Sequence, residues 1–218
     1  MLLRKHLFFP ATDIFQSHEI NGLGPILAYS LKQFVHESEV IVRKSSSESE
    51  IRLHLRPMLE KLIQTSDSVS PESFAPRKDR FAINLLHMPQ DKGYSIIGGV
   101  WKPDQTTPIH DHLTWALIGV YDGEEREALF RRTDEGSNPK FAKLEKVSER
   151  ANKKGHVTVL GHTGIHRVDN LTEKTVTNIH VYGRDIGNTE RHSYDPVTGE
   201  IGRFLSGYCN VLRDDEPY

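Results

Sequence analysis

The segment Asn178-Ile-His-Val-Tyr182 alternates polar and apolar side chains, which is the period of a β-strand. Its polar members share one face, and the interior of a barrel is apolar unless it holds a ligand. A buried cluster of mutually hydrogen-bonded side chains is the alternative interpretation. The segment belongs to a series of short apolar runs that Gly, Pro, Asp and Asn separate, at 81–88, 94–101, 113–121, 126–131, 141–147, 156–160, 165–168, 175–183 and 201–205. Such a series predicts a sandwich or a barrel.

One of the turns between these runs has a specific signature. Tyr121-Asp-Gly-Glu124 contains Asp-Gly, a pair that suits the positive φ angles of tight hairpin turns. The sequence therefore predicts a hairpin at this position.

The chain before residue 70 carries helical patterns instead. Leu27, Leu31, Phe34 and Val35 fall on one helix face, and Pro25 stands near the start, where a missing N–H costs little. A second stripe is interrupted by a proline, so either the helix is kinked there or it begins there; its residues are Ile51, Leu55, Pro57, Met58, Leu59 and Leu62.

The polar segments around the second stripe predict the boundaries of the helical section. The segment 45–50 is rich in serine and predicts a loop that leads into a capped helix. The segment 66–80 is polar and contains two prolines, which indicates a connector. We therefore expect a single domain over 1–218, in which helices in 1–70 pack on a barrel formed by 80–210.

The composition excludes several classes of protein. The chain has 218 residues, of which 36% are hydrophobic and 27% charged, so it can bury a sizeable core. The net charge of −2 provides no basic excess for nucleic acid. The longest apolar runs are shorter than the roughly 20 residues that span a bilayer, and charges interrupt the N-terminal apolar residues, so we expect a cytoplasmic protein.

Cysteine and histidine usage is unequal. Cys209 is the only cysteine, so the chain cannot form an internal disulfide or a cysteine-rich zinc site. The chain has 12 histidines, and two of them stand in Thr107-Pro-Ile-His-Asp-His112. On a strand, His110 and His112 point to the same face and can share one metal ion, whereas Asp111 points away. Two partly exposed histidines at a sheet edge are the alternative.

A third histidine stands in a comparable position. His166 lies on a strand-like run directly after a glycine turn in Gly161-His-Thr-Gly-Ile-His166. It is placed to supply a further ligand from a neighbouring strand of the same barrel.

These segments resemble the cysteine dioxygenase type I family of thiol dioxygenases, within the cupin superfamily. His110, His112 and Gly123 match the first cupin motif, in which Asp104 replaces a glycine and Ala116 a glutamate. The second motif is matched in part; Gly155, His166 and Asn170 fit it, and Gly161 and Thr163 depart from it. The resemblance covers about residues 80–205 and implies a mainly β cupin fold, that is, a double-stranded β-helix or jelly-roll barrel, with an N-terminal α-helical section.

The resemblance also implies a reaction. His110, His112 and His166 would hold Fe(2+), and the absence of a carboxylate at Ala116 leaves positions open for a substrate thiolate and O2. The product would be a sulfinic acid that contains both oxygen atoms. The partners are then a small thiol and O2, with neither nucleic acid nor membrane among them; the oligomeric state stays open.

Further site residues follow from the same resemblance. His180 and Tyr182 match the family's Ser-His-Tyr triad as catalytic residues, with Asn178 in place of the serine, where its amide can still hydrogen-bond the imidazole. Ala116 occupies the position from which some members cross-link a cysteine to the tyrosine, so no such cross-link forms here.

An arginine that binds the substrate carboxylate would decide the choice of substrate. Cysteine dioxygenases of the mammalian type supply it before the His-x-His pair, near Ile83 in this chain, which cannot serve. The bacterial 3-mercaptopropionate branch supplies it after the tyrosine, and Arg191 falls at the matching distance, with Arg184 and Arg167 as competitors. We therefore expect 3-mercaptopropionate to be preferred over L-cysteine.

Two other functions fit the same pattern. One is a cupin metalloenzyme of different chemistry, such as an isomerase or another dioxygenase. The other is a metal-free cupin that binds a small molecule. The sequence assigns no role to His87, His192 or Cys209.

Overall fold

A computed structural model describes residues 29–211, so the predictions for Pro25 and Leu27 lie outside the described residues. Two α-helices, α1 (Leu31–Lys44) and α2 (Glu48–Gln64), and a short 3₁₀ helix (Pro71–Phe74) precede the strands of this part of the chain. The strands are β1 (Ala82–His87), β2 (Ser95–Trp101), β3 (Ile109–Asp111), β4 (Ala116–Asp122), β5 (Glu124–Arg132), β6 (Leu144–Lys153), β7 (Val157–Leu160), β8 (Ile165–Asp169), β9 (Val176–Tyr182), β10 (Arg191–Tyr194) and β11 (Ile201–Phe204).

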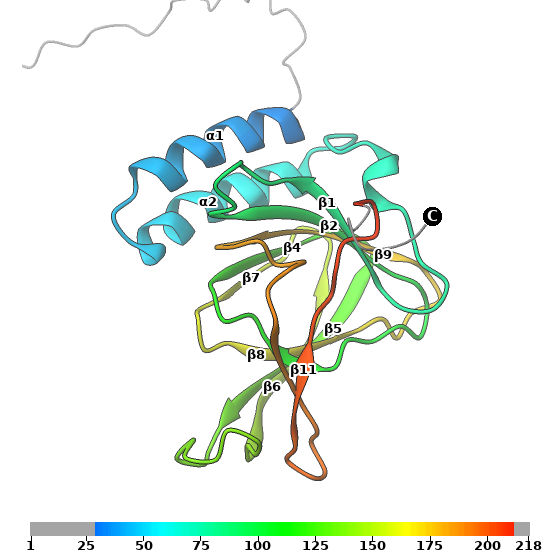
Figure 1. The fold of residues 1–218 in the computed structure, drawn as a ribbon. Coiled ribbons are helices and arrows are strands. Elements are labelled where there is room, and N and C mark those ends of the chain that lie inside the picture. Colours follow the sequence, from blue (N-terminus) through cyan, green and yellow to red (C-terminus); the bar gives the residue numbers. More distant parts are fainter. Residues whose placement is uncertain (1–28, 212–218) are drawn as a thin grey trace, which may run out of the picture.

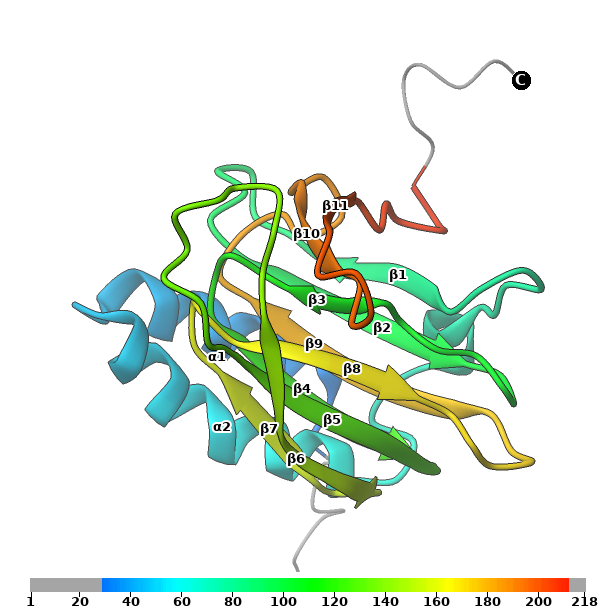
Figure 2. The same cartoon turned by 90° about the horizontal axis from the view of Figure 1, so that it is seen from below.

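The strands form two antiparallel sheets, which face each other in Figures 1 and 2. The strand order is β1-β2-β9-β4-β7 in the first sheet and β11-β10-β3-β8-β5-β6 in the second. Apolar side chains from both sheets meet between them, among them Ile97 and Ile118 from the first and Val168 from the second. The chain repeatedly crosses from one sheet to the other, as in a jelly-roll barrel. The predicted fold class, mainly β with N-terminal helices, is confirmed.

The turn at Tyr121–Glu124 corrects one prediction. The tight turn is present, and Gly123 adopts a φ of 87°, a conformation that favours glycine. It does not close a hairpin, because β4 pairs with β7 and β9, whereas β5 pairs with β6 and β8. The turn instead carries the chain from one sheet to the other.

The strand boundaries also differ in part from the predicted runs. β6 extends to Lys153, beyond the predicted end at 147, because it is an exposed edge strand with mostly polar side chains. β3 and β10 were not among the predicted runs, since both are short and rich in polar residues.

The helices begin at side-chain caps. Ser30 and Gln33 form a capping box at α1, and the Ser47 hydroxyl accepts a hydrogen bond from the backbone N–H of Glu50 at α2. The predicted capped helix after the serine-rich loop is therefore confirmed. α2 is one continuous element that includes Pro57, so it does not begin at the proline.

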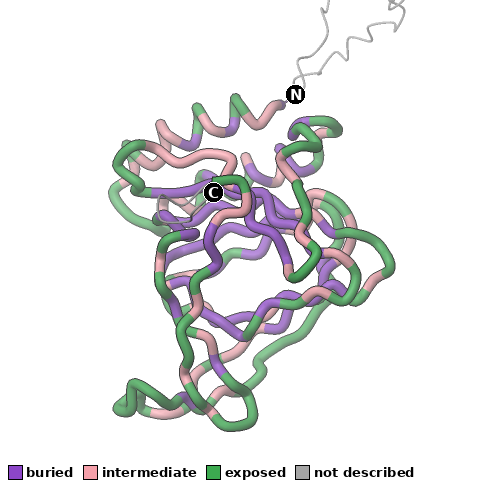
Figure 3. The backbone as a smooth tube through the Cα atoms, turned by 45° about the vertical axis from the view of Figure 1, so that its right-hand side comes forward, coloured by how far each residue is buried: buried purple, intermediate pink, exposed green. Residues whose placement is uncertain are grey.

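Helix α2 covers the outer face of the first sheet (Figure 1), and the buried residues gather in the layers between the helices and the second sheet (Figure 3). Its buried face carries Leu55, Leu59, Leu62 and Ile63. The packing is close at Gly119 of β4, where an added Cβ would lie 3.1 Å from Ile63 Cδ1. The helix thus stabilises the sheet that supplies one wall of the interior.

Leu59→Ala is expected to reduce the free energy of unfolding by about 2–5 kcal/mol, because a fully buried leucine is replaced by a cavity. Leu53→Ala is the matched control on the same helix, where the side chain is 71% exposed and the expected change is below about 0.5 kcal/mol. Urea denaturation of both variants measures the difference. Equal losses in the free energy of unfolding of the two variants would contradict the burial of Leu59 against the sheet.

Within residues 29–211, no helix is both long enough and apolar enough to cross a membrane.

Candidate metal centre and substrate cavity

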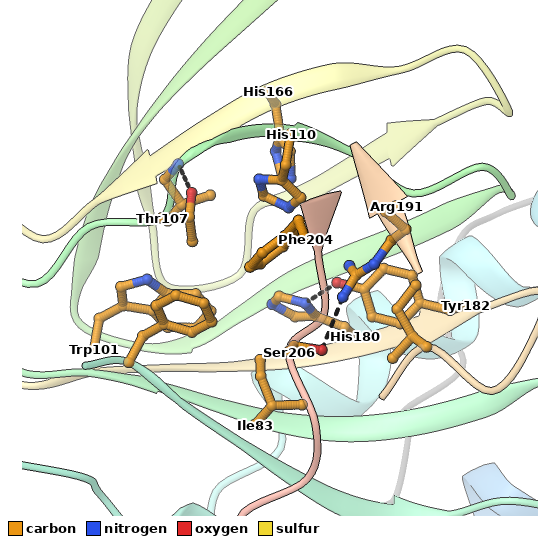
Figure 4. Close-up of a pocket in the computed structure, with 13 residues that line it drawn as sticks. Ile83, Trp101, Thr107, His110, His166, His180, Tyr182, Arg191, Phe204 and Ser206 are labelled. Carbon is orange, nitrogen blue, oxygen red and sulfur yellow. Dashed lines mark hydrogen bonds between the residues drawn. The ribbon is translucent and has the colours of Figure 1, made fainter. Parts of the chain in front are cut away.

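A cavity lies between the two sheets (Figure 4). Its empty space, the open mouth included, measures about 370 Å³, of which only about 20 Å³ can hold the centre of a water molecule. The lining is aromatic and aliphatic with a few polar groups, and it consists of Phe81, Ile83, Trp101, Thr107, His110, His166, Val168, His180, Tyr182, Ile186, Arg191, Phe204 and Ser206. The size favours a ligand of few heavy atoms.

Three histidines cluster at this end of the interior, and two of them, His110 and His166, line the cavity. His110 on β3 pairs in register with His166 on β8, and His112 follows directly after β3. The ring centroids lie 4.7 to 4.9 Å from one another, and each ring offers a nitrogen within 4.8 Å of the others. All three side chains are buried. The structure therefore brings together the three residues that the sequence predicts as metal ligands.

The hydrogen bonds of the rings define their protonation. His110 Nδ1 lies 2.9 Å from the carbonyl oxygen of Pro108, and His166 Nδ1 lies 3.0 Å from Glu127 Oε1. Because a carbonyl or a carboxylate only accepts, Nδ1 carries a proton in both rings, so Nε2 is the nitrogen that can bind a metal ion. Burial, together with the neighbouring His166, holds the pKa of His110 and of His112 well below the usual range.

His112 differs from the other two histidines. Neither of its ring nitrogens has a hydrogen-bond partner among residues 29–211, although both are buried. A buried polar atom without a partner is costly, so such an atom marks a place for a ligand. A metal ion held between the three rings would satisfy it.

Behind His166 lies a buried carboxylate that the sequence analysis missed. Glu127 on β5 is fully buried, and its Oε2 accepts hydrogen bonds from Thr158 (2.7 Å), Asn152 (3.0 Å) and Arg150 (3.2 Å). Burial opposes its ionisation, but the hydrogen bonds from His166, Thr158 and Asn152 outweigh it and lower the pKa of Glu127 to about 2. The one available signal was the alternate spacing of two glutamates on a strand.

The second glutamate of this pair, Glu125, is buried beside the first. It accepts a hydrogen bond of 2.6 Å from the Asn178 amide. Burial and the charge of Glu127 raise the pKa of Glu125 to about 7. One of the two carboxyl groups is therefore ionised at neutral pH, whereas the other is close to its midpoint.

The raised pKa of Glu125 predicts a pH dependence of stability. Between the ordinary value of 4.5 and about 7, the folded chain binds more protons than the unfolded chain, so this group makes stability fall as pH rises. The loss amounts to about 3 kcal/mol across that range. Glu125→Gln should remove it, which urea unfolding of both metal-free proteins at pH 5 and pH 8 would measure. An unchanged difference between the two pH values would contradict the assignment.

The polar triad of β9 shares one face, as its alternation predicts, but its hydrogen bonds differ from the expectation. His180 Nδ1 lies 2.7 Å from the Tyr182 hydroxyl. The Asn178 amide donates to Glu125 and not to His180, because the Glu125 carboxyl group lies within reach on β5. The predicted contact of Asn178 with the imidazole is therefore wrong, and His180 Nε2 has no partner among the described residues.

Burial lowers the pKa of His180 to about 3 and raises the pKa of Tyr182 well above its usual value. At neutral pH the imidazole is therefore neutral and the phenol keeps its proton. The centre of the Tyr182 ring lies 4.9 Å from that of His112, so the tyrosine packs against one of the three clustered histidines.

Ala116 faces Tyr182 directly across the β4–β9 pair. Its methyl group is buried in the apolar core and offers neither a metal ligand nor a sulfur atom next to Tyr182.

Arg191 on β10 lines the same cavity. Its Nε donates to the carbonyl of Thr189 and its Nη2 donates to Ser206 Oγ at 2.8 Å. The guanidinium lies 4.6 Å from the centre of the Phe204 ring (Figure 4). Within the described part of the chain no carboxylate pairs with it, and burial lowers the pKa of Arg191. A buried cation without an anion indicates an anionic ligand.

The other arginines considered as carboxylate-binding residues lie outside the cavity. Arg184 is exposed, and Arg167 pairs with Asp169 outside the cavity. His192 points away from the three histidines and contacts Asp111 Oδ2 at 2.8 Å. Ile83 lines the cavity as an apolar residue.

Comparison with known proteins gives two kinds of match. The family described as cysteine dioxygenase type I matches residues 65–194. An uncharacterized conserved protein with a double-stranded beta-helix domain from Klebsiella pneumoniae subsp. pneumoniae MGH 78578 is 14% identical, covering 56% of this chain and 94% of that one at a TM-score of 0.41.

Two enzymes give similar values. An oxalate oxidase is 17% identical, covering 53% of this chain and 59% of its own at a TM-score of 0.41. A hydroquinone 1,2-dioxygenase is 12% identical, covering 50% and 67% at a TM-score of 0.39.

The family match spans more than half of the chain and includes all three clustered histidines, His180, Tyr182 and Arg191. The chain belongs to the cysteine dioxygenase type I family.

Proposed function

We propose that this protein is an iron-dependent thiol dioxygenase that converts a small mercapto-carboxylic acid and O2 to the sulfinic acid. 3-Mercaptopropionate is the preferred substrate ahead of L-cysteine. The observation that carries this proposal is one cavity whose lining includes His110 and His166 of the three clustered histidines, together with a buried arginine that has no counter-ion among residues 29–211.

The donor set fits a divalent metal ion. His110 and His166 leave Nε2 as the nitrogen that can bind a metal ion, and His112 has two buried nitrogens without partners among residues 29–211. Among the described residues, no carboxylate joins this group. Three neutral imidazoles suit ferrous iron and leave positions open for substrates. When bound, such an ion favours the deprotonated form of a thiol and supplies the one-electron chemistry that O2 requires.

Arg191 fixes the orientation of the substrate. Its guanidinium can bind the substrate carboxylate through parallel hydrogen bonds, with Ser206 beside it and Phe204 restricting its movement. A mercapto-acid held in this way points its sulfur from Arg191 toward the histidines across a short cavity.

The absence of acidic side chains supports the preference for 3-mercaptopropionate. Of the described residues that line the cavity, none is an aspartate or a glutamate. The ammonium group of L-cysteine would therefore be buried next to Arg191 without an anion to compensate for its desolvation. 3-Mercaptopropionate has the same thiol and carboxylate but lacks this group.

Tyr182 and His180 supply a directed hydroxyl group. Because His180 is neutral and close to the phenol, the pair holds one proton between Tyr182 Oη and His180 Nδ1. Both residues line the cavity, so the hydroxyl can offer a hydrogen bond to a ligand bound there. The net reaction adds both atoms of O2 to the sulfur of RSH and gives RSO2H, so no further reductant is needed.

An oxygen-electrode assay with iron-loaded protein and a panel of thiols tests the proposal. We expect uptake with 3-mercaptopropionate, weaker uptake with L-cysteine and mercaptosuccinate, and least with cysteamine, which has no carboxylate. The absence of uptake with every thiol would overturn the proposed reaction. Equal rates with cysteamine and 3-mercaptopropionate would overturn the role of Arg191.

A further inference from the structure

We propose that Glu127 is a positioning residue for the metal centre, which orients His166 and places a negative charge directly behind it. This inference rests on the proposed function only in requiring that the three histidines bind a metal ion. It assigns a role to a fully buried carboxylate that belongs to neither cupin motif.

Glu127 is held on both sides. One oxygen, Oε1, accepts from His166 Nδ1 at 3.0 Å, while Oε2 accepts from Thr158, Asn152 and Arg150. In the β5–β8 pair, Leu129 stands opposite His166, so Glu127 reaches the imidazole diagonally across the sheet. With its acceptor sites filled and no exposed surface, the carboxylate has one orientation, and it fixes both the tautomer and the direction of the His166 ring.

The three histidines differ in what lies behind them. His110 is hydrogen-bonded to a peptide carbonyl, and His112 has no hydrogen-bond partner among the described residues. His166 differs from both, because it is hydrogen-bonded to a carboxylate. A carboxylate behind a histidine makes the ring a stronger electron donor. His166 is therefore the strongest of the three donors.

The charge of Glu127 has a second consequence. Ala116 stands at the position where the first cupin motif has a glutamate, so a divalent ion among three neutral rings would keep its full charge. The carboxylate of Glu127 compensates for part of the charge of the ion without itself being a metal ligand. Arg150 offsets this charge only in part, because its side chain is 44% exposed and lies at the opposite oxygen.

Glu127→Gln tests this role, since glutamine can still accept the hydrogen bond from His166 but has no charge. Competition for Zn²⁺ with a chromophoric chelator is expected to show a 10- to 100-fold weaker affinity than in the unchanged protein. In the iron-loaded form, the reduction potential should become more positive, because loss of the negative charge disfavours the ferric state. Glu127→Asp keeps the charge and should restore most of the potential.

Glu125→Gln is the matched control, because Glu125 lies on the same strand, is also buried and contacts Asn178 but not His166. At pH 6 it should leave Zn²⁺ affinity and iron potential unchanged. Equal losses in both variants would overturn the assignment, since the effect would then come from disturbing the buried carboxyl pair. Unchanged affinity and potential in Glu127→Gln would also overturn it.

A measurement on the unchanged protein covers the case in which Glu127→Gln does not fold. In the zinc-loaded, ¹⁵N-labelled chain, the Nδ1–H proton of His166 should resonate further downfield than that of His110, because its acceptor is charged. Equal shifts would overturn the proposal. Failure of the unchanged protein to bind Zn²⁺ or iron would instead refute the three-histidine centre itself, so the two failures are distinguishable.

Discussion

Replacing His112 by alanine is expected to abolish thiol-dependent oxygen uptake and to weaken metal binding by about 100-fold or more. The expected loss exceeds the roughly 10- to 100-fold effect of residues that act through a ligand, because His112 would itself be a ligand. Neither ring nitrogen has a partner among residues 29–211, so the structure gives the imidazole no hydrogen-bonding role within this part of the fold. Metal analysis after anaerobic loading, together with chelator competition, measures the effect.

His162→Ala provides the control for this variant. His162 is exposed and lies in the loop that precedes β8, so the His162→Ala variant should retain full metal binding. Circular dichroism checks that His112→Ala is folded. Retention of one tightly bound ion by folded His112→Ala would contradict its place in the ligand set.

Arg191→Ala is expected to raise the KM for 3-mercaptopropionate by about 10- to 150-fold. This corresponds to the loss of about 1.5–3 kcal/mol, the usual value for a hydrogen bond to a charged group. Arg191 is buried, is held by Thr189 and Ser206, and has no anionic partner among the described residues, so its removal mainly affects a bound anion. Steady-state oxygen uptake over a range of substrate concentrations measures KM.

Two controls separate carboxylate binding from a general disturbance of the cavity. Arg184→Ala, at an exposed position nearby in sequence, should leave KM unchanged. Cysteamine has no carboxylate, so Arg191→Ala should not lower the already slow oxygen uptake with cysteamine. An unchanged KM for 3-mercaptopropionate in Arg191→Ala would refute the assignment.

Strand periodicity explains why much of the site was predictable. Side chains two residues apart lie on one face, so the spacing of His110 and His112 and the alternation of Asn178, His180 and Tyr182 already define which groups face inward. The inward polar face indicated a ligand site before any tertiary contact was known. The role of Arg191 was predicted only from the resemblance to the family, because nothing in the sequence around a single arginine shows that its side chain is buried.

Contacts between strands that are distant in sequence were not predictable in this way. Glu127 meets His166 only because β5 and β8 pair in one particular register. Asn178 on β9 meets Glu125 on β5 because the two sheets pack face to face. The turn at Gly123 shows a related limit. Asp-Gly specifies a local backbone conformation, but the sheet to which the next strand belongs depends on packing across the whole barrel.

The most direct test of the account is the fate of the oxygen atoms when iron-loaded protein turns over 3-mercaptopropionate under ¹⁸O2. A dioxygenase at this cavity should consume one O2 for each sulfinic acid formed, and mass spectrometry should find both labelled atoms in the product. Unlabelled product, a disulfide in place of the sulfinic acid, or oxygen uptake without added thiol would contradict it.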